Sequence, residues 1–197
     1  MIILNYLYFD LETTGFQHSS DILEFGGLLC NEDFEVIRLI NEYFYYSDPI
    51  PYGAVSVHGL TNQKLEFLAQ RDFLTAAPEI FELVSDENVC LCGHNIIKYD
   101  IPVLKNNLNR SGISWNTDNL KVIDTLLLSR QMYSGSHKLE QVLQYCLHKS
   151  GCTQEAIDAT FKNELAKFPD VVVDEDKKYH SALYDSFICW CIHMGMK

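Results

Sequence analysis

Three apolar segments follow one another in the first 45 residues, separated only by short polar connectors. They cover residues 6–11, 22–30 and 34–45 and are rich in the aromatic and β-branched residues that favour strands. The connectors at 15–20 and 31–33 have the composition of turns. Consecutive strands joined by short links pair as an antiparallel meander. The chain is therefore predicted to open with three neighbouring strands of one sheet.

The remainder of the chain predicts two more strands and a series of helices. Short apolar stretches at 89–93 and 120–124 are expected as buried strands. Helices are expected after Thr61, a suitable N-cap, and over 78–84, 102–110, 125–132, 138–147, 153–167 and 179–194. Residues 47–59 are expected as a loop, and residues 168–178 as an acidic, mobile loop. This order predicts a single α/β domain over residues 1–197, with a mixed five-stranded sheet flanked by helices. An extra helix and acidic loop are expected at about 150–178.

The net charge of −12 is distributed unevenly along the chain. Residues 1–97 carry 3 basic and 15 acidic side chains, whereas residues 98–197 carry 12 of each. This pattern lacks the basic footprint of a protein that holds duplex nucleic acid through many phosphates. It still allows a protein that grips one strand end through metal ions and a few cations. The candidate cations are Lys98, Lys105, Arg110, Lys121, Arg130 and Lys138.

The seven cysteines bear on the cellular compartment. Their odd number and the absence of a C-x-x-C pair indicate reduced thiols, most of them small buried residues, and their C-x-C spacing does not match a zinc site. No run is long and apolar enough to span a bilayer, and residues 1–8 are expected to open the first strand rather than to form a secretory leader. We therefore expect a cytoplasmic, reducing location and no membrane partner.

Four acidic residues and one histidine fall in three local motifs. Asp10 and Glu12 lie in DLETTG, Asp100 ends GHNIIKYD, and His180 and Asp185 bound HSALYD. Because alternate residues of a strand share a face, the carboxylates of Asp10 and Glu12 are predicted to point the same way. Like charges that converge are tolerated only when they hold hard cations or share protons. Taken alone, the pair is equally well explained as two solvated acids at a strand end.

The other two motifs add to this set. Asp100 falls between a predicted strand and a helix N-terminus, where open α/β sheets place their sites and where negative charge is favourable, although an ordinary first-turn acid fits too. His180 and Asp185 are separated by about 140° around a regular helix, so both reach one site only if His180 lies outside it. His94 and Asn95 are expected to support the cleft through hydrogen bonds.

In this order, the three motifs resemble those of the DnaQ-like, or DEDDh, family of 3′→5′ exonucleases, over residues 6–192. Tyr99 stands where that family usually has Phe, and Ser181 stands where the sister subclass has Tyr, so the histidine subclass is the better match. The segments VHGLT at 57–61 and VIDTLLLSR at 122–130 also resemble family elements. The chain departs from compact members in the 32 residues that separate Leu147 from His180.

The resemblance implies a ribonuclease H-like fold and a metal-dependent exonuclease that shortens single-stranded DNA or RNA from its 3′ end and releases nucleoside 5′-monophosphates. It implies two Mg²⁺ or Mn²⁺ ions held by four ligands, with a histidine as the base for the attacking water. The ligands would be Asp10, Glu12, Asp100 and Asp185, and the base would be His180. Substrate contacts would come from Thr13, Thr14, Gly15, Phe16, His58 and Asn95, with Asp124 in a supporting position.

Other functions remain open at this point. One is a catalytically weak nucleic-acid or polymerase-associated binding module on the same fold, with the acidic first half as a partner surface. Another is a different metal phosphoesterase or an integrase-like nuclease, which the HSALYD spacing disfavours. The preference for RNA or DNA, a polymerase partner and the oligomeric state are also left open.

Overall fold

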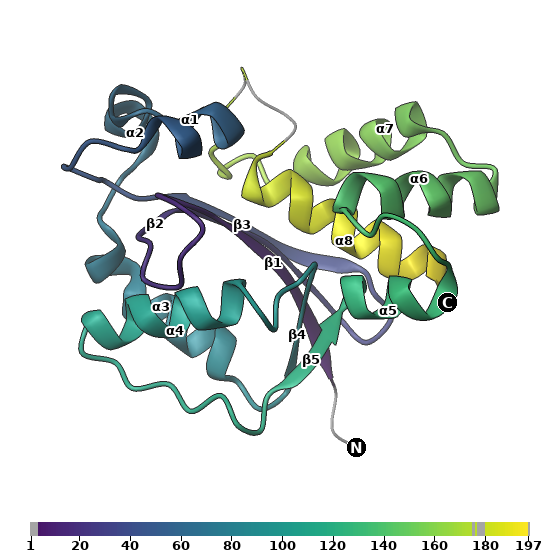
Figure 1. Ribbon diagram of the computed structural model, residues 1–197, viewed down its shortest axis with the longest axis horizontal. Coiled ribbons are helices and arrows are strands. Elements are labelled where there is room, and N and C mark those ends of the chain that lie inside the picture. The colour runs from purple at the N-terminus through teal and green to yellow at the C-terminus, as the bar shows by residue number, and fades with distance from the viewer. Residues whose placement is uncertain (1–3, 175, 177–179, 197) are drawn as a thin grey trace.

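The computed structural model describes residues 4–174, 176 and 180–196. Its centre is a five-stranded mixed sheet in the order β3-β2-β1-β4-β5 (Figure 1). The strands β1 (Asn5–Thr13), β2 (Ile22–Cys30) and β3 (Val36–Tyr43) form the antiparallel meander. β4 (Val89–Gly93) and β5 (Lys121–Asp124) continue the sheet in parallel from β1. The predicted α/β, ribonuclease H-like sheet is confirmed.

Helices cover both faces of this sheet. They are α1 (Tyr52–His58), α2 (Asn62–Leu68), α3 (Phe73–Ser85), α4 (Asp100–Arg110), α5 (Thr125–Met132), α6 (Leu139–Ser150), α7 (Gln154–Leu165) and α8 (Ala182–Met196). In Figure 1, α3 and α4 lie on one side of the sheet, and α6, α7 and α8 lie on the other. None of the helices in the described part of the chain has the length and apolar character that a membrane crossing requires.

The alternation of side chains along β1 decides where the acidic residues lie. Leu7, Phe9 and Leu11 enter a buried cluster with residues of α3 and α4. Tyr8 points the other way, into a second cluster with residues of α6 and α8. Asp10 and Glu12 continue the Tyr8 side of the strand, so both carboxylates lie on the face that α8 covers.

α8 lies directly against this face because β2 carries a glycine at the point of closest approach. A Cβ atom added at Gly26 would lie 2.0 Å from the backbone nitrogen of Leu183, which is closer than two atoms can pack. The first turn of α8 therefore sits on the backbone of β2, next to β1. This close approach brings Asp185, in that first turn, towards Asp10 and Glu12.

Two predictions of secondary structure were wrong, both around prolines. Residues 47–59 were expected as a loop, but α1 begins directly after Pro51 and ends at His58, where Gly59, with a φ of 69°, caps its C-terminus. A proline just before a helix costs nothing, because the first helical N–H groups have no partner inside the helix. α3 was expected at 78–84, but it begins at Phe73 because Asp72 caps it through Thr75 N, and Pro78 lies inside.

The other elements lie within a few residues of their predicted positions. Thr61 caps α2 as expected, through a hydrogen bond from Lys64 N. The last helix begins at Ala182 rather than at 179, a residue that lies outside the described part of the chain. All seven cysteines are free thiols, and five of them are buried.

Candidate active site

Three of the predicted ligands converge at the ends of β1 and α8. One carboxylate oxygen each from Asp10, Glu12 and Asp185 lies within 4.8 Å of the others. β1 supplies the first two side chains from one face, and the first turn of α8 supplies the third. Residues 175 positions apart in the sequence therefore form one acidic cluster.

Asp100 adds a fourth, deeply buried carboxylate. It is the first residue of α4 and is 3% exposed. The backbone N–H groups of Asp100 and Leu11 lie near this carboxylate and partly offset the rise that burial causes in its pKa. Its Oδ1 atom has no hydrogen-bond partner among the described residues. A buried acceptor of this kind, beside an acidic cluster, has the chemistry of a ligand atom for a hard cation.

The electrostatics of the cluster support the same conclusion. Burial raises the pKa of Asp100 to about 8. The pKa of Asp10 is raised well above its ordinary value by burial first and then by the charges of Asp100, Asp185 and Glu12. The ionised cluster is therefore unfavourable without a compensating positive charge, and oxygen-binding divalent cations such as Mg²⁺ or Mn²⁺ fit this donor set.

His180 lies in the turn that precedes α8, so the prediction that it lies off the helix is confirmed. Its backbone is left-handed, with a φ of 57°, and its side chain is about half exposed. Its Nε2 atom is 3.7 Å from Oε1 of Glu140, in the first turn of α6. His180 and Asp185 line the same open hollow of about 560 Å³ between α6 and α8. The imidazole is thus accessible from solvent at the side of the acidic cluster.

A second, smaller hollow of about 100 Å³ borders the cluster at Glu12. Five predicted site residues line it: Glu12, Thr13, Gly15, Phe16 and His58. Phe16 is 80% exposed at its rim. His58 is buried and supports the wall: its Nδ1 accepts from Leu60 N, so its Nε2 carries the proton and donates to the carbonyl of Thr13.

Tyr99, in the position that departs from the family pattern, closes this hollow. Its hydroxyl lies 2.7 Å from Thr13 Oγ1 and 2.6 Å from the carbonyl oxygen of Gly15. Thr13 Oγ1 lies 2.7 Å from the same carbonyl. Two hydroxyl protons serve three close oxygen atoms, so the hydroxyl of Thr13 is held by protein atoms. Its predicted contact with the substrate sugar remains a prediction.

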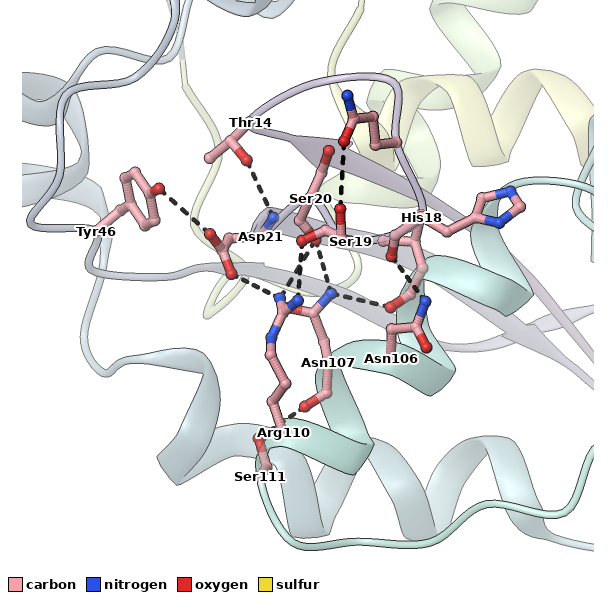
Figure 2. A network of polar contacts seen from close by, with 12 residues as sticks. Thr14, His18, Ser19, Ser20, Asp21, Tyr46, Asn106, Asn107, Arg110 and Ser111 are labelled. Atoms are coloured by element: carbon pink, nitrogen blue, oxygen red, sulfur yellow. Dashed lines mark hydrogen bonds and ion pairs between the residues drawn. The ribbon is translucent and has the colours of Figure 1, made fainter.

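The loop after the first motif is fastened to α4 and to Tyr46, as Figure 2 shows. Arg110 donates to Asp21 Oδ1 at 2.6 Å and to the carbonyl of Ser19 at 2.8 Å. Tyr46 donates to Asp21 Oδ2, and Thr14 Oγ1 accepts from Asp21 N at 3.0 Å. The hydroxyl of Thr14 therefore helps to close the loop. Since Arg110 is used here, it holds the loop rather than presenting a free cation.

The residues of the second motif hold the turns around the site. His94 donates through Nε2 to the carbonyl of His137, 2.8 Å away, in the segment that leads into α6. Asn95, with a φ of 63°, donates its backbone N–H to Asp124, which also accepts from Leu126 N and caps α5. The supporting positions expected for His94 and Asp124 agree with these bonds, and the predicted substrate contact of Asn95 remains a prediction.

Glu24 is the residue of this region that the sequence reasoning missed. It is 1% exposed, lies on β2 directly opposite Glu12, and its pKa is raised to about 7, mainly by burial. A single acid in the middle of the apolar run at 22–30 was the available signal. No cysteine belongs to the acidic cluster formed by the described residues.

Comparison with known proteins agrees with this fold and identifies the family. The family model for exonucleases, RNase_T, matches residues 7–190. The chain is 28% identical over 139 residues to a PolC-type DNA polymerase III of Clostridium perfringens. This match covers 68% of the chain and 9% of the polymerase. A structure of exonuclease I superposes with a TM-score of 0.76 at 18% identity, over 98% of this chain and 41% of that one. A zinc-bound complex of E. coli exonuclease I with single-stranded DNA superposes with a TM-score of 0.72 at 20% identity. This match covers 98% of this chain and 40% of that one.

Proposed function

The chain belongs to the RNase_T exonuclease family, and from this premise we propose that it is a metal-dependent 3′→5′ exonuclease acting on single-stranded nucleic acid ends. The product would be a nucleoside 5′-monophosphate. The observation that carries the proposal is the convergence of Asp10, Glu12 and Asp185 within 4.8 Å, beside the buried and unsatisfied oxygen of Asp100. The chain spans about two fifths of exonuclease I and less than a tenth of the polymerase. The substrate and the partners of this chain are therefore proposals.

The four carboxylates have one task in this proposal, which is to hold two divalent cations, Mg²⁺ or Mn²⁺. When bound, such ions supply Lewis-acid stabilisation of the charge on the scissile phosphate and on the leaving 3′ oxygen. The raised pKa values of Asp10 and Asp100 mean that protons compete for the same oxygen atoms. Cation binding should therefore strengthen as the pH rises.

His180 would take the proton from the attacking water. Its exposed side chain lies on the hollow that Asp185 also lines, so water and substrate can reach it. Glu140, 3.7 Å from Nε2, would stabilise the imidazolium that forms. The position of His180 outside α8 lets its side chain move independently of Asp185.

The small hollow beside Glu12 would receive the terminal nucleotide. Phe16 at its rim offers an exposed aromatic face, on which a base can stack without regard to sequence. The exonuclease I complex with single-stranded DNA supports a single-stranded substrate, and the match to a PolC-type polymerase supports a polymerase as a possible partner.

The proposal is tested with 5′-labelled single-stranded DNA and RNA incubated with Mg²⁺ or Mn²⁺. We expect a ladder that shortens from the 3′ end, release of 5′-monophosphates and complete inhibition by EDTA. Asp10→Asn should reduce the rate by at least about 100-fold, because it removes a carboxylate from the cation site.

Asp33→Asn is the matched control. It makes the same chemical change in the exposed turn that joins β2 to β3, outside the acidic cluster. Equal rates for the two variants, or no shortening by the wild-type protein with either metal, would refute the proposal. Tight binding of the labelled strand without cleavage would favour the alternative, a binding module on this fold.

A further inference from the structure

The two stretches of chain on either side of His180 are fastened to one buried group of side chains on β2 and β3. We infer that Glu24, Tyr43 and Asn41 form a positioning anchor that sets the place of His180 relative to the acidic cluster. This inference rests on the proposed function, because it concerns the residue proposed there as the base.

The anchor holds the chain after His180 through the start of α8. The carboxylate of Glu24 lies beside the backbone N–H of Ala182, two residues beyond His180, and this N–H partly offsets the rise that burial causes in the pKa of Glu24. That carboxylate is buried, and Gly26 two residues along β2 leaves room for α8 to approach so closely. The only carboxylate on β2 thus faces the first residue of the helix that carries Asp185, and its Oε1 atom has no hydrogen-bond partner among the described residues.

The same group holds the chain before His180. Asn41 donates through Nδ2 to the carbonyl of Val172, at 2.9 Å, and to the hydroxyl of Tyr43, at 3.1 Å. The backbone N–H of Asp174 donates to the same hydroxyl, at 3.2 Å. Asp174 also forms an ion pair with Lys64 on α2.

The hydrogen-bond inventory of Tyr43 shows why these bonds form one unit. A phenol has two acceptor positions and one proton. The acceptor positions are used by Asn41 and Asp174, so the proton is left for the neighbouring carboxylate of Glu24, whose pKa the phenol lowers. Tyr43 is 3% exposed, so water does not replace a lost bond easily. Loss of this one hydroxyl would loosen both stretches together.

This arrangement bears on the backbone conformation of His180. A left-handed residue outside a helix is held in place only if its surroundings fix it. The anchor contacts the nearest described stretches on both sides of His180, at Val172 and Asp174 and at Ala182. Tyr43 and Glu24 are therefore positioning residues, because they act on His180 through the backbone and do not line either hollow.

The test uses Tyr43→Phe and Glu24→Gln in the full chain, with Glu42→Gln as the control. Glu42 is the neighbour of Tyr43 on β3, but its side chain pairs with Arg71. Tyr43→Phe should lower kcat about tenfold and leave KM within about twofold, as expected when a supporting hydrogen bond to an active-site group is lost. In the His180→Ala background, Tyr43→Phe should cause no further loss of kcat. Glu42→Gln should behave like wild type.

A purely structural effect of Tyr43→Phe would instead multiply with that of His180→Ala, and this outcome would overturn the inference. A second readout does not need activity. Amide hydrogen exchange of the peptides containing 171–174 and 182–185 should rise together in Tyr43→Phe and Glu24→Gln, but not in Glu42→Gln. Exchange that is unchanged, or raised on one side only, would also overturn it. If the wild-type protein cleaves nothing, the proposed function fails while the exchange experiment still decides on the anchor.

Discussion

Single residues in this site are defined by what surrounds them. Asp100 shows this best, because burial raises its pKa from 3.8 to about 8. Between these two values, the folded protein without metal binds a proton that the unfolded chain releases. The stability that this proton contributes is fully present below about pH 4 and is lost as the pH rises through about 8.

Asp100→Asn tests this linkage, since an amide keeps the shape of the protonated acid. In EDTA, the variant should be more stable than wild type above about pH 8, by on the order of 2 kcal/mol, and the difference should shrink towards about pH 5. Thermal unfolding followed by circular dichroism across this pH range measures it. A difference that is constant with pH would show that Asp100 is not the group responsible.

The residues that local patterns could predict are those whose partners are close in sequence or follow from strand alternation. Asp10 and Glu12 share a face because they are two apart on a strand. His180 was predicted to lie off the helix because, five residues from Asp185, it would otherwise point away from the same site. Glu24 and Tyr99 were not predicted as parts of the site. Their roles depend on contacts with Ala182 and Thr13, which lie 158 and 86 residues away.

At the scale of elements, the approach of α8 to β2 positions the C-terminal half of the site. Gly26→Ala should therefore push the first turn of α8 away from the sheet, because the added Cβ would meet Leu183 N at 2.0 Å. We expect a loss of about 1–3 kcal/mol in the free energy of unfolding, together with a reduced cleavage rate.

Gly53→Ala is the control for this change. It lies in α1, and an added Cβ there meets no atom within 4 Å. This variant should keep wild-type activity and gain up to about 1 kcal/mol, since alanine is a better helix former. Urea unfolding and the rate on a labelled strand compare the two variants. Equal stability of both would show that α8 does not rest on Gly26.

Element boundaries were predictable where caps and apolar periods agreed, as at Thr61 for α2. They were missed at two prolines: Pro51 was interpreted as part of a loop, and Pro78 was placed in the first turn of its helix although the helix begins five residues earlier. Proline removes one N–H and fixes one dihedral angle, but it does not by itself end a helix that is capped upstream. In α3 that cap is Asp72, which accepts a hydrogen bond from Thr75 N. Packing of the apolar face of α3 in the buried cluster also stabilises the helix around Pro78.

For the whole molecule, the order of strands is what assembles the site. β1 lies between β2 and β4, so the ends of these strands bring Asp10, Glu12 and Asp100 to one region, and α8 crosses the same face with Asp185. The path of residues 171–174 beside β3 was not predictable, because it depends on two side chains, Asn41 and Tyr43, that have no local signature.

In the proposed mechanism, fixed carboxylates hold the cations and one histidine, His180, moves a proton. The most direct measurement is the single-turnover cleavage rate of a 5′-labelled single strand by His180→Ala, across a range of Mn²⁺ concentrations. We predict a rate lowered by about 100-fold or more, as expected for loss of a general base, with an unchanged half-saturating Mn²⁺ concentration. A near-normal rate, or a half-saturating concentration shifted as in Asp185→Asn, would contradict it.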